Sequence, residues 1–232
     1  MKKTLLSILF TISIFVANAQ TTAIPDANFE QVLINLGLDS GPIDATVLTA
    51  NINAITYLDV SSSNVNDLTG IEDFTTLDSL DCNDNFFLNS INLTQNPALS
   101  YFNCKETSIS SLDVSQNTAL KYLSCSGFLG MGGVSTLDVT QNIGLKYLDC
   151  KNSSLSIFDI SQNTDLTYLD CSEQTGSLDS LDISNNLMLS HLNCSNNFQL
   201  NYVDVTNNPA LTSLDCSNTS LSNLDVTQNT NL

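Results

Sequence analysis

The sequence has 232 residues with 24 Asp or Glu and only 6 Lys or Arg, so its formal net charge is −18. All six basic residues are lysines, and there is one histidine and no tryptophan. A chain this acidic repels phosphate groups, which excludes nucleic acids and anionic membrane surfaces as favourable partners. Its 42% hydrophobic content argues against a disordered acidic tail. The scarcity of His, the lack of Arg and the lack of a metal-binding Cys spacing favour a non-enzymatic protein without a cofactor or metal.

Residues 1–19 have the three parts of a secretory signal peptide. The start carries two lysines, an apolar run extends from residue 5 to residue 16, and Ala17-Asn18-Ala19 supplies the small residues of a cleavage site. The apolar run is shorter than the ~20 residues that cross a bilayer, which argues against a membrane anchor. We therefore expect bacterial export, a mature chain that begins at Gln20 without membrane insertion, and a secreted or cell-surface location.

Residues 20–54 are predicted to form an N-terminal helical cap. The stretch 24–38 has the pattern of a short amphipathic helix, with Asp26 suited to its start and Gly37 to its end. Four apolar residues fall at helical spacing on one face and are expected to close the open end of a repeat core. These residues are Phe29, Val32, Leu33 and Leu36.

From residue 55 to residue 232 the sequence repeats itself. One block ends in cysteine, as in Leu145-Lys-Tyr-Leu-Asp-Cys150, and occurs seven times at spacings of 22, 21, 25, 21, 23 and 22 residues. A second block of the same shape, such as Leu137-Asp-Val-Thr-Gln-Asn142, alternates with the first. We call the two the Cys blocks and the Asp-Val blocks. Each repeat unit therefore consists of two half-repeats of ten or eleven residues.

Both blocks fit the leucine-rich-repeat pattern L-x-x-L-x-L-x-x-N, with Cys or Val/Ile at the third apolar position. The array, about 178 of 232 residues, resembles the nested 21-residue leucine-rich repeats of the IRREKO type in exported bacterial proteins. The resemblance implies a mainly β leucine-rich-repeat solenoid with a short N-terminal helical cap, and relatives often carry a C-terminal sorting domain. We expect two parallel β-sheets, one from each kind of block, and an array that continues or is truncated at the C-terminus.

The physical reason for a solenoid is that a single unit cannot fold alone. Ordering its backbone costs about 1–2 kcal/mol per residue, which exceeds what its few buried side chains return. Because strand residues alternate between faces, Leu148 and Cys150 should point inward while Tyr147 and Asp149 face solvent. Stacked coils then cover one another's apolar side chains.

An asparagine recurs at the end of the Asp-Val blocks and is expected to bond both the N–H and the C=O groups of the turns that lack strand partners. We call this set the structural asparagine ladder. Its members are Asn96, Asn117, Asn142, Asn163, Asn186, Asn208 and Asn229.

The seven cysteines leave three alternatives: buried free thiols, disulfide bridges or a metal site. Side chains at equivalent positions of neighbouring parallel strands point the same way and lie about one strand spacing apart, which does not suit a disulfide. No C-x-x-C motif occurs. The pattern therefore favours free thiols that pack as small apolar side chains.

Exposed positions of the Cys blocks form two columns that together make a candidate recognition strip for a protein or carbohydrate ligand. The alternative is that these residue types are simply favourable on an exposed strand and have no binding role. The third position gives Tyr101, Tyr122, Tyr147, Tyr168 and His191, and the fifth includes Asp149, Asp170 and Asp215.

The Asp-Val blocks carry a further column of carboxylates, the acidic column. Calcium binding would relieve their mutual repulsion, but a flat column offers few ligands per ion, and a solvated acidic face is the other interpretation. The members are Asp113, Asp138, Asp159, Asp182, Asp204 and Asp225.

The leading functional hypothesis is a non-enzymatic, exported leucine-rich-repeat protein that presents an extended surface for protein or glycan binding or adhesion. One alternative is a passive spacer that holds a C-terminal domain at a distance. The other is an accessory region of a secreted hydrolase.

Overall fold

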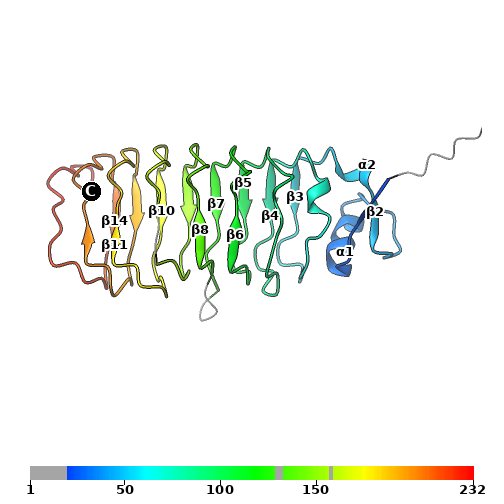
Figure 1. Ribbon diagram of the computed structural model, residues 1–232, viewed down its shortest axis with the longest axis horizontal. Coiled ribbons are helices and arrows are strands. Elements are labelled where there is room, and N and C mark those ends of the chain that lie inside the picture. Colours follow the sequence, from blue (N-terminus) through cyan, green and yellow to red (C-terminus); the bar gives the residue numbers. More distant parts are fainter. Residues whose placement is uncertain (1–19, 129–132, 157–158) are drawn as a thin grey trace, which may run out of the picture.

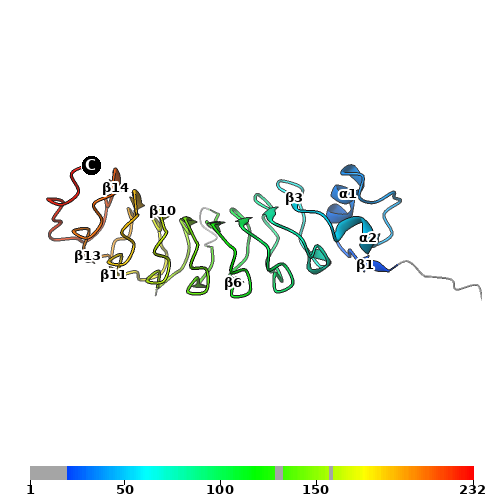
Figure 2. The same ribbon diagram turned by 90° about the horizontal axis from the view of Figure 1, so that it is seen from above.

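The computed structural model describes residues 20–128, 133–156 and 159–232. The expected signal peptide, residues 1–19, lies outside these ranges. The coils stack side by side into a long rod, and the two helices, α1 (Ala27–Asn35) and α2 (Thr49–Ile52), lie at its N-terminal end (Figures 1 and 2). None of the helices in the described part of the chain has the length and apolarity that a membrane crossing requires.

The seven Cys blocks and the stretch 55–60 that precedes them form one parallel eight-stranded sheet in the order β14-β12-β10-β9-β7-β5-β4-β3, which confirms the expected solenoid. Equivalent residues pair in register, so that Leu123, Leu148 and Leu169 lie side by side on successive strands. The strands are β3 (Tyr57–Asp59), β4 (Ser79–Asp81), β5 (Tyr101–Asn103), β7 (Tyr122–Ser124), β9 (Tyr147–Asp149), β10 (Tyr168–Asp170), β12 (His191–Asn193) and β14 (Ser213–Asp215).

The Asp-Val blocks pair in parallel, as expected for a second sheet. Within the described residues they give two parallel pairs, β6 (Ser111–Asp113) with β8 (Thr136–Asp138) and β11 (Ser180–Leu181) with β13 (Tyr202–Val203). In the Asp-Val blocks, as after several Cys strands, the aspartate side chain accepts the backbone N–H two residues on. Asp138 Oδ1, for example, accepts the N–H of Thr140 at 2.9 Å. Residues 157–158, which begin another such block, lie outside the described ranges.

The core is a single stack of leucine, valine, isoleucine, phenylalanine and cysteine side chains. Leu148 and Cys150 are both completely buried, whereas Tyr147 between Lys146 and Leu148 faces outward. All seven cysteines are free thiols, six of them buried and Cys216 partly exposed. Burial raises the pKa of the Cys194 thiol to about 12 and that of Cys150 well above its usual value. The thiols therefore serve as small apolar side chains.

The asparagine ladder is buried and joins each coil to the one before it. Asn163 Nδ2 donates to the carbonyl oxygens of Val139 at 3.0 Å and Asn142 at 2.8 Å, and the other members repeat this pattern. Only the donor side of the amide is used. The Asn163 Oδ1 atom is buried without a hydrogen-bond partner among the described residues, so our expectation of bonds to backbone N–H groups is wrong.

A second set of buried polar residues follows the Cys strands, and sequence reasoning missed its role. Asn85 Oδ1 accepts the N–H of Val65 at 2.8 Å, while its Nδ2 donates to Val60 and Cys82 carbonyls. Asn197 and Gln174 occupy the equivalent place on later coils. The sequence feature that could have predicted these buried residues is the asparagine three positions after Cys82 and after Cys194.

The N-terminal end is closed by α1 and by a two-stranded antiparallel ribbon, β1 (Thr21–Ala23) with β2 (Thr46–Leu48). The Asp26 carboxylate caps α1 by accepting the N–H groups of Asn28 and Phe29. Phe29 and Leu33 are completely buried, but Leu36 is 53% exposed, contrary to its expected place on the packed face. The helix ends at Asn35, and Leu36 is its C-cap residue.

Two further contacts fix this end of the chain to the first coil. The completely buried Glu30 carboxylate accepts the backbone N–H groups of Asp44 and Ala45. Gly70, which precedes the 3₁₀ helix η1 (Ile71–Asp73), has φ of +102°, and a Cβ there would lie 2.6 Å from the carbonyl oxygen of Ala23. Only glycine allows the ribbon to come this close.

Candidate binding face

The tyrosines of the predicted strip form a continuous stack, which we call the tyrosine column. Ring centroids are 4.3 Å apart for Tyr101 and Tyr122, 4.2 Å for Tyr122 and Tyr147, and 4.2 Å for Tyr147 and Tyr168. Neighbouring rings are nearly parallel, with interplanar angles from 7° to 13°. His191 continues the column more loosely, at 6.1 Å and 29° from Tyr168.

Stacking decides which part of each ring a ligand can reach. Both faces of Tyr122 and Tyr147 are covered by neighbouring rings, so only their edges and hydroxyl groups face outward. Partial burial and the adjacent phenol raise the pKa of Tyr101 to about 12, and burial likewise raises the pKa of Tyr168. The hydroxyl groups of these two residues therefore remain neutral donors and acceptors at physiological pH.

The fifth-position residues form a second column beside the tyrosines, held by cross-strand hydrogen bonds. Asn193 Nδ2 donates to Asp170 Oδ2 at 3.0 Å, and Ser124 Oγ donates to Asp149 Oδ2 at 3.2 Å. Asp149 and Asp170 are register partners, so two carboxylates lie side by side. Burial raises the pKa of Asp149, and the Asp170 charge adds to the rise.

Asp215 belongs to the same column but has the opposite electrostatic setting. It is more exposed than Asp149, and the N–H of Ser217 lies 2.9 Å from its Oδ1. This bond, together with the Ser217 hydroxyl, lowers the pKa of Asp215. The column is thus not electrostatically uniform along the rod.

All four lysines that follow residue 19 lie on the coils that carry the tyrosines. Lys105 and Lys151 pair with glutamates, at 3.5 Å from Glu106 and 3.2 Å from Glu173. Lys121 and Lys146 directly precede Tyr122 and Tyr147 and lie on neighbouring coils, joined by a backbone bond of 2.9 Å. Within the described ranges neither of these two makes a salt bridge. The middle of the tyrosine column therefore carries two lysines that are not neutralised by a salt bridge within the described residues.

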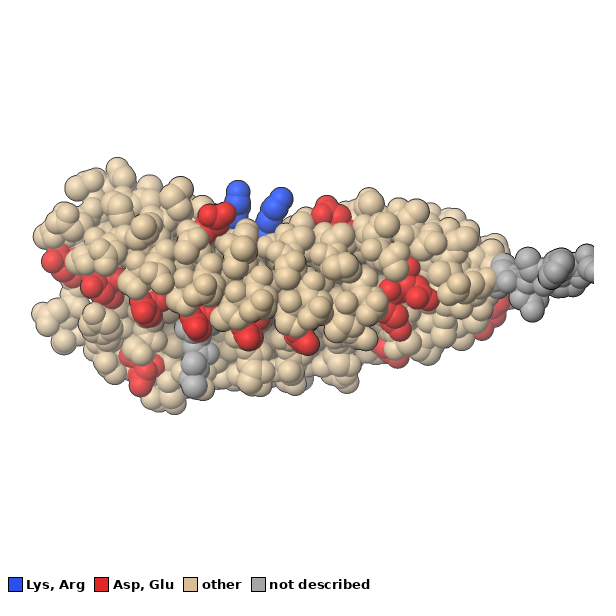
Figure 3. All heavy atoms as spheres, turned by 45° about the horizontal axis from the view of Figure 1, so that its top comes forward, with Lys and Arg blue, Asp and Glu red and all other residues tan. Residues whose placement is uncertain are grey.

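The acidic column lies on the Asp-Val side of the coils. A regular row of acidic side chains runs along the rod in Figure 3, while lysines gather near its middle. Each column carboxylate accepts the N–H two residues on, as Asp113 does from Ser115, and the Ser115 hydroxyl and N–H lower the pKa of Asp113. No three His, Cys, Asp or Glu side chains of the described residues are grouped so as to hold a metal ion.

With this architecture the chain is a leucine-rich-repeat solenoid. No protein-family model matches the sequence, and no curated protein matches it. Its solved structural neighbours include bacterial leucine-rich-repeat proteins.

One neighbour is the functional domain of InlJ from Listeria monocytogenes, which includes a cysteine ladder. It is 33% identical with a TM-score of 0.72, over 92% of this chain and 51% of that chain. This chain thus spans about half the length of that neighbour.

Two others show the fold alone. Internalin C2 from Listeria monocytogenes is 16% identical with a TM-score of 0.77, over 93% of this chain and 96% of that chain. The leucine-rich-repeat protein LIC12759 from Leptospira interrogans is 22% identical with a TM-score of 0.59, over 70% of this chain and 43% of that chain.

Proposed function

We propose that this protein is an exported, non-enzymatic leucine-rich-repeat scaffold that binds a protein partner at the bacterial surface or outside the cell. The observation that carries the proposal is the tyrosine column on the eight-stranded sheet. Tyrosine is enriched among the residues that dominate binding energy at protein interfaces. Export is supported by the signal-peptide pattern of residues 1–19.

The stacking favours a protein over a glycan at this face. A sugar ring packs its C–H groups against the open face of an aromatic ring, and the faces of Tyr122 and Tyr147 are already covered. What remains is a ridge of ring edges and hydroxyl groups on a broad sheet, which suits hydrogen bonds and side-chain contacts from a protein surface.

Charge supports a partner with acidic residues at its contact surface. Lys121 and Lys146 are adjacent and free of salt bridges within the described residues, so they can each pair with a partner carboxylate. The acidic column on the other blocks would repel the same partner and so orient it toward the tyrosine column.

The test is a binding comparison between the protein and two triple variants. The purified protein is used to isolate partners from cell-surface extracts of neighbouring cells, and direct binding is then measured with the purified partner. Tyr122→Ala/Tyr147→Ala/Tyr168→Ala is expected to abolish binding. Gln116→Ala/Gln141→Ala/Gln162→Ala, at exposed uncharged sites on the other blocks, is the matched control and should bind normally. Unchanged binding by the tyrosine variant would rule out this face.

A further inference from the structure

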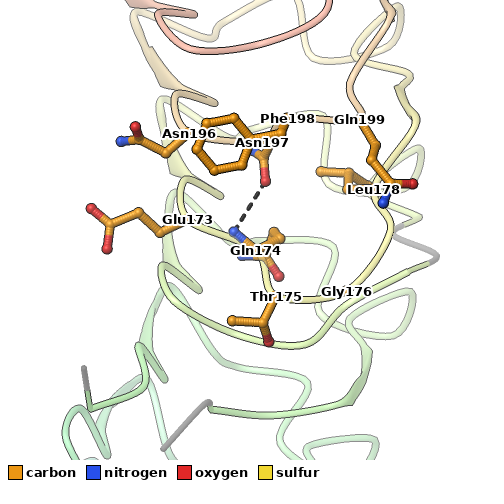
Figure 4. Close-up of a pocket in the computed structure, with 9 residues that line it drawn as sticks. All are labelled: Glu173, Gln174, Thr175, Gly176, Leu178, Asn196, Asn197, Phe198 and Gln199. Carbon is orange, nitrogen blue, oxygen red and sulfur yellow. Dashed lines mark hydrogen bonds between the residues drawn. The ribbon is translucent and has the colours of Figure 1, made fainter. Parts of the chain in front are cut away.

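A pocket lies outside the tyrosine column, at the edge of the rod where the Cys strands end. It has a volume of about 360 Å³ and lies between the coil that follows Cys171 and the coil that follows Cys194. Phe198 and Asn196 come from the later coil and Glu173, Thr175 and Gly176 from the earlier one (Figure 4). We call it the edge pocket.

The edge pocket exists because one backbone bond of the solenoid is not made there. Where the residue four positions after the cysteine is Ser or Thr, it donates its N–H to the preceding coil, as Thr175 does to Ser153 at 2.8 Å and Ser220 to Leu200 at 2.8 Å. Phe86, at this position after Cys82, shows no such bond among the described residues. Phe198 is at the same position, yet its N–H makes no such bond among the described residues. The two coils are therefore separated at this edge.

Gly176 allows the loop that follows Cys171 to lie close to the coil before it, rather than close to Phe198. A Cβ at residue 176 would be 2.6 Å from the carbonyl oxygen of Leu155, so only glycine lets this loop press onto the coil before it. The loop is thereby drawn away from Phe198. The buried Gln174 and Asn197 still bridge the two coils at the base, where Gln174 N–H donates to Asn197 Oδ1 at 3.0 Å (Figure 4).

The lining combines one large apolar face with polar groups around it. The Phe198 ring is 73% exposed, at a position that carries Ser108, Thr175 and Ser220 on other coils and the 40% exposed Phe86 on one. Gln199 and Leu178 lie on one side of the ring and Glu173 and Asn196 on the other (Figure 4). The side-chain amide of Gln199 makes no hydrogen bond within the described residues, so it is available to a ligand.

The charge and polarity of the pocket lining favour some classes of ligand over others. An anion is disfavoured by Glu173 and by the net charge of the chain, and a cation gains little because Lys151 already pairs with Glu173 at 3.2 Å. A purely apolar ligand would leave the Gln199 amide unpaired. A neutral molecule with one apolar face and several hydroxyl groups satisfies both parts of the lining, and a pyranose ring has this character.

We propose that the edge pocket binds a neutral saccharide, with one pyranose ring stacked on Phe198 and its hydroxyl groups bonded to Gln199, Asn196 and Glu173. Ligand pockets run from about 300 to 1,000 Å³, so this volume suits one or two sugar units. The site is independent of the tyrosine column, so either can fail without the other.

The test is an NMR titration of the purified protein with maltose, cellobiose, lactose and chitobiose, and with digalacturonate as the anionic comparison. At least one neutral disaccharide is expected to give saturable shifts of the amides of residues 173–178 and 196–199. Phe198→Ala should weaken that binding about tenfold or more, because the stacking face is removed.

Phe87→Ala is the matched control, because Phe87 is 72% exposed and does not line the edge pocket. It should bind as the unaltered protein does, and Phe198→Trp should retain binding because it keeps an aromatic face. The proposal is overturned if no neutral disaccharide shifts these amides, if digalacturonate binds more tightly than all of them, or if Phe198→Ala binds normally.

Discussion

At the scale of single residues, the asparagine ladder holds the coils together through one half of each amide. Asn163→Ala removes two donors, but the carbonyl oxygens of Val139 and Asn142 each keep a backbone partner, Asn142 N–H and Leu145 N–H respectively. The expected loss in free energy of unfolding is therefore at the lower end of about 1–3 kcal/mol. Urea unfolding measures it, and the exposed neighbour variant Gln162→Ala should unfold as the unaltered protein does.

The buried thiols give a second prediction at this scale. Burial raises the pKa of Cys104, Cys125, Cys150 and Cys171 well above the usual value, so almost no thiolate exists at pH 8. Iodoacetamide should modify the undenatured protein only at the partly exposed Cys216, and all seven cysteines after addition of urea. Mass spectrometry counts the adducts, and several adducts on the folded protein would contradict the buried stack.

At the scale of strands, register could be predicted from the sequence because the Cys blocks repeat so regularly. One strand per coil brings equivalent residues together, which is why Tyr122 and Tyr147 were expected as neighbours. The lengths of the second-sheet strands could not be predicted. The Asp-Val blocks repeat about as regularly as the Cys blocks, yet β11 and β13 are only two residues long.

The edge pocket was likewise beyond the sequence pattern. It depends on Gly176 allowing a close approach to Leu155, and on a backbone bond that Phe198 does not make. A repeat pattern reports what successive coils share, so it does not reveal where two of them separate.

The paired carboxylates of β9 and β10 predict a pH effect. The pKa of Asp149 in the folded protein is raised, so the folded state binds more protons above the ordinary value of about 3.9, and stability falls as the pH rises through that window. Asp149→Asn should raise the melting temperature at pH 7, and the gain should narrow at pH 3. The new amide can donate to Asp170, as Asn193 does.

Asp215→Asn is the control with the opposite sign. The pKa of Asp215 is lowered by the Ser217 N–H, so its contribution is present at neutral pH and is lost on acidification. This variant should melt at a lower temperature at pH 7. Equal changes in melting temperature for Asp149→Asn and Asp215→Asn would contradict an electrostatic origin of these effects.

At the scale of the whole molecule, the lysines that follow residue 19 all lie on the coils of the tyrosine column, in an otherwise acidic chain. If a protein partner binds there, Lys121→Glu/Lys146→Glu should slow association by about tenfold or more at low salt, with a smaller effect at high salt. Surface plasmon resonance with the purified partner measures the rates. Lys105→Gln/Lys151→Gln, at lysines that already pair with glutamates, should change the rate less.

The tyrosine column also gives the protein an intrinsic spectroscopic signal of how its coils are stacked. The chain has six tyrosines and no tryptophan, and four of those tyrosines are stacked within 4.3 Å of their neighbours. Chromophores this close couple electronically, so the near-ultraviolet circular dichroism of the protein is dominated by the order of one stack. Any event that slips one coil against the next, or that covers the column, can thus be followed without a label.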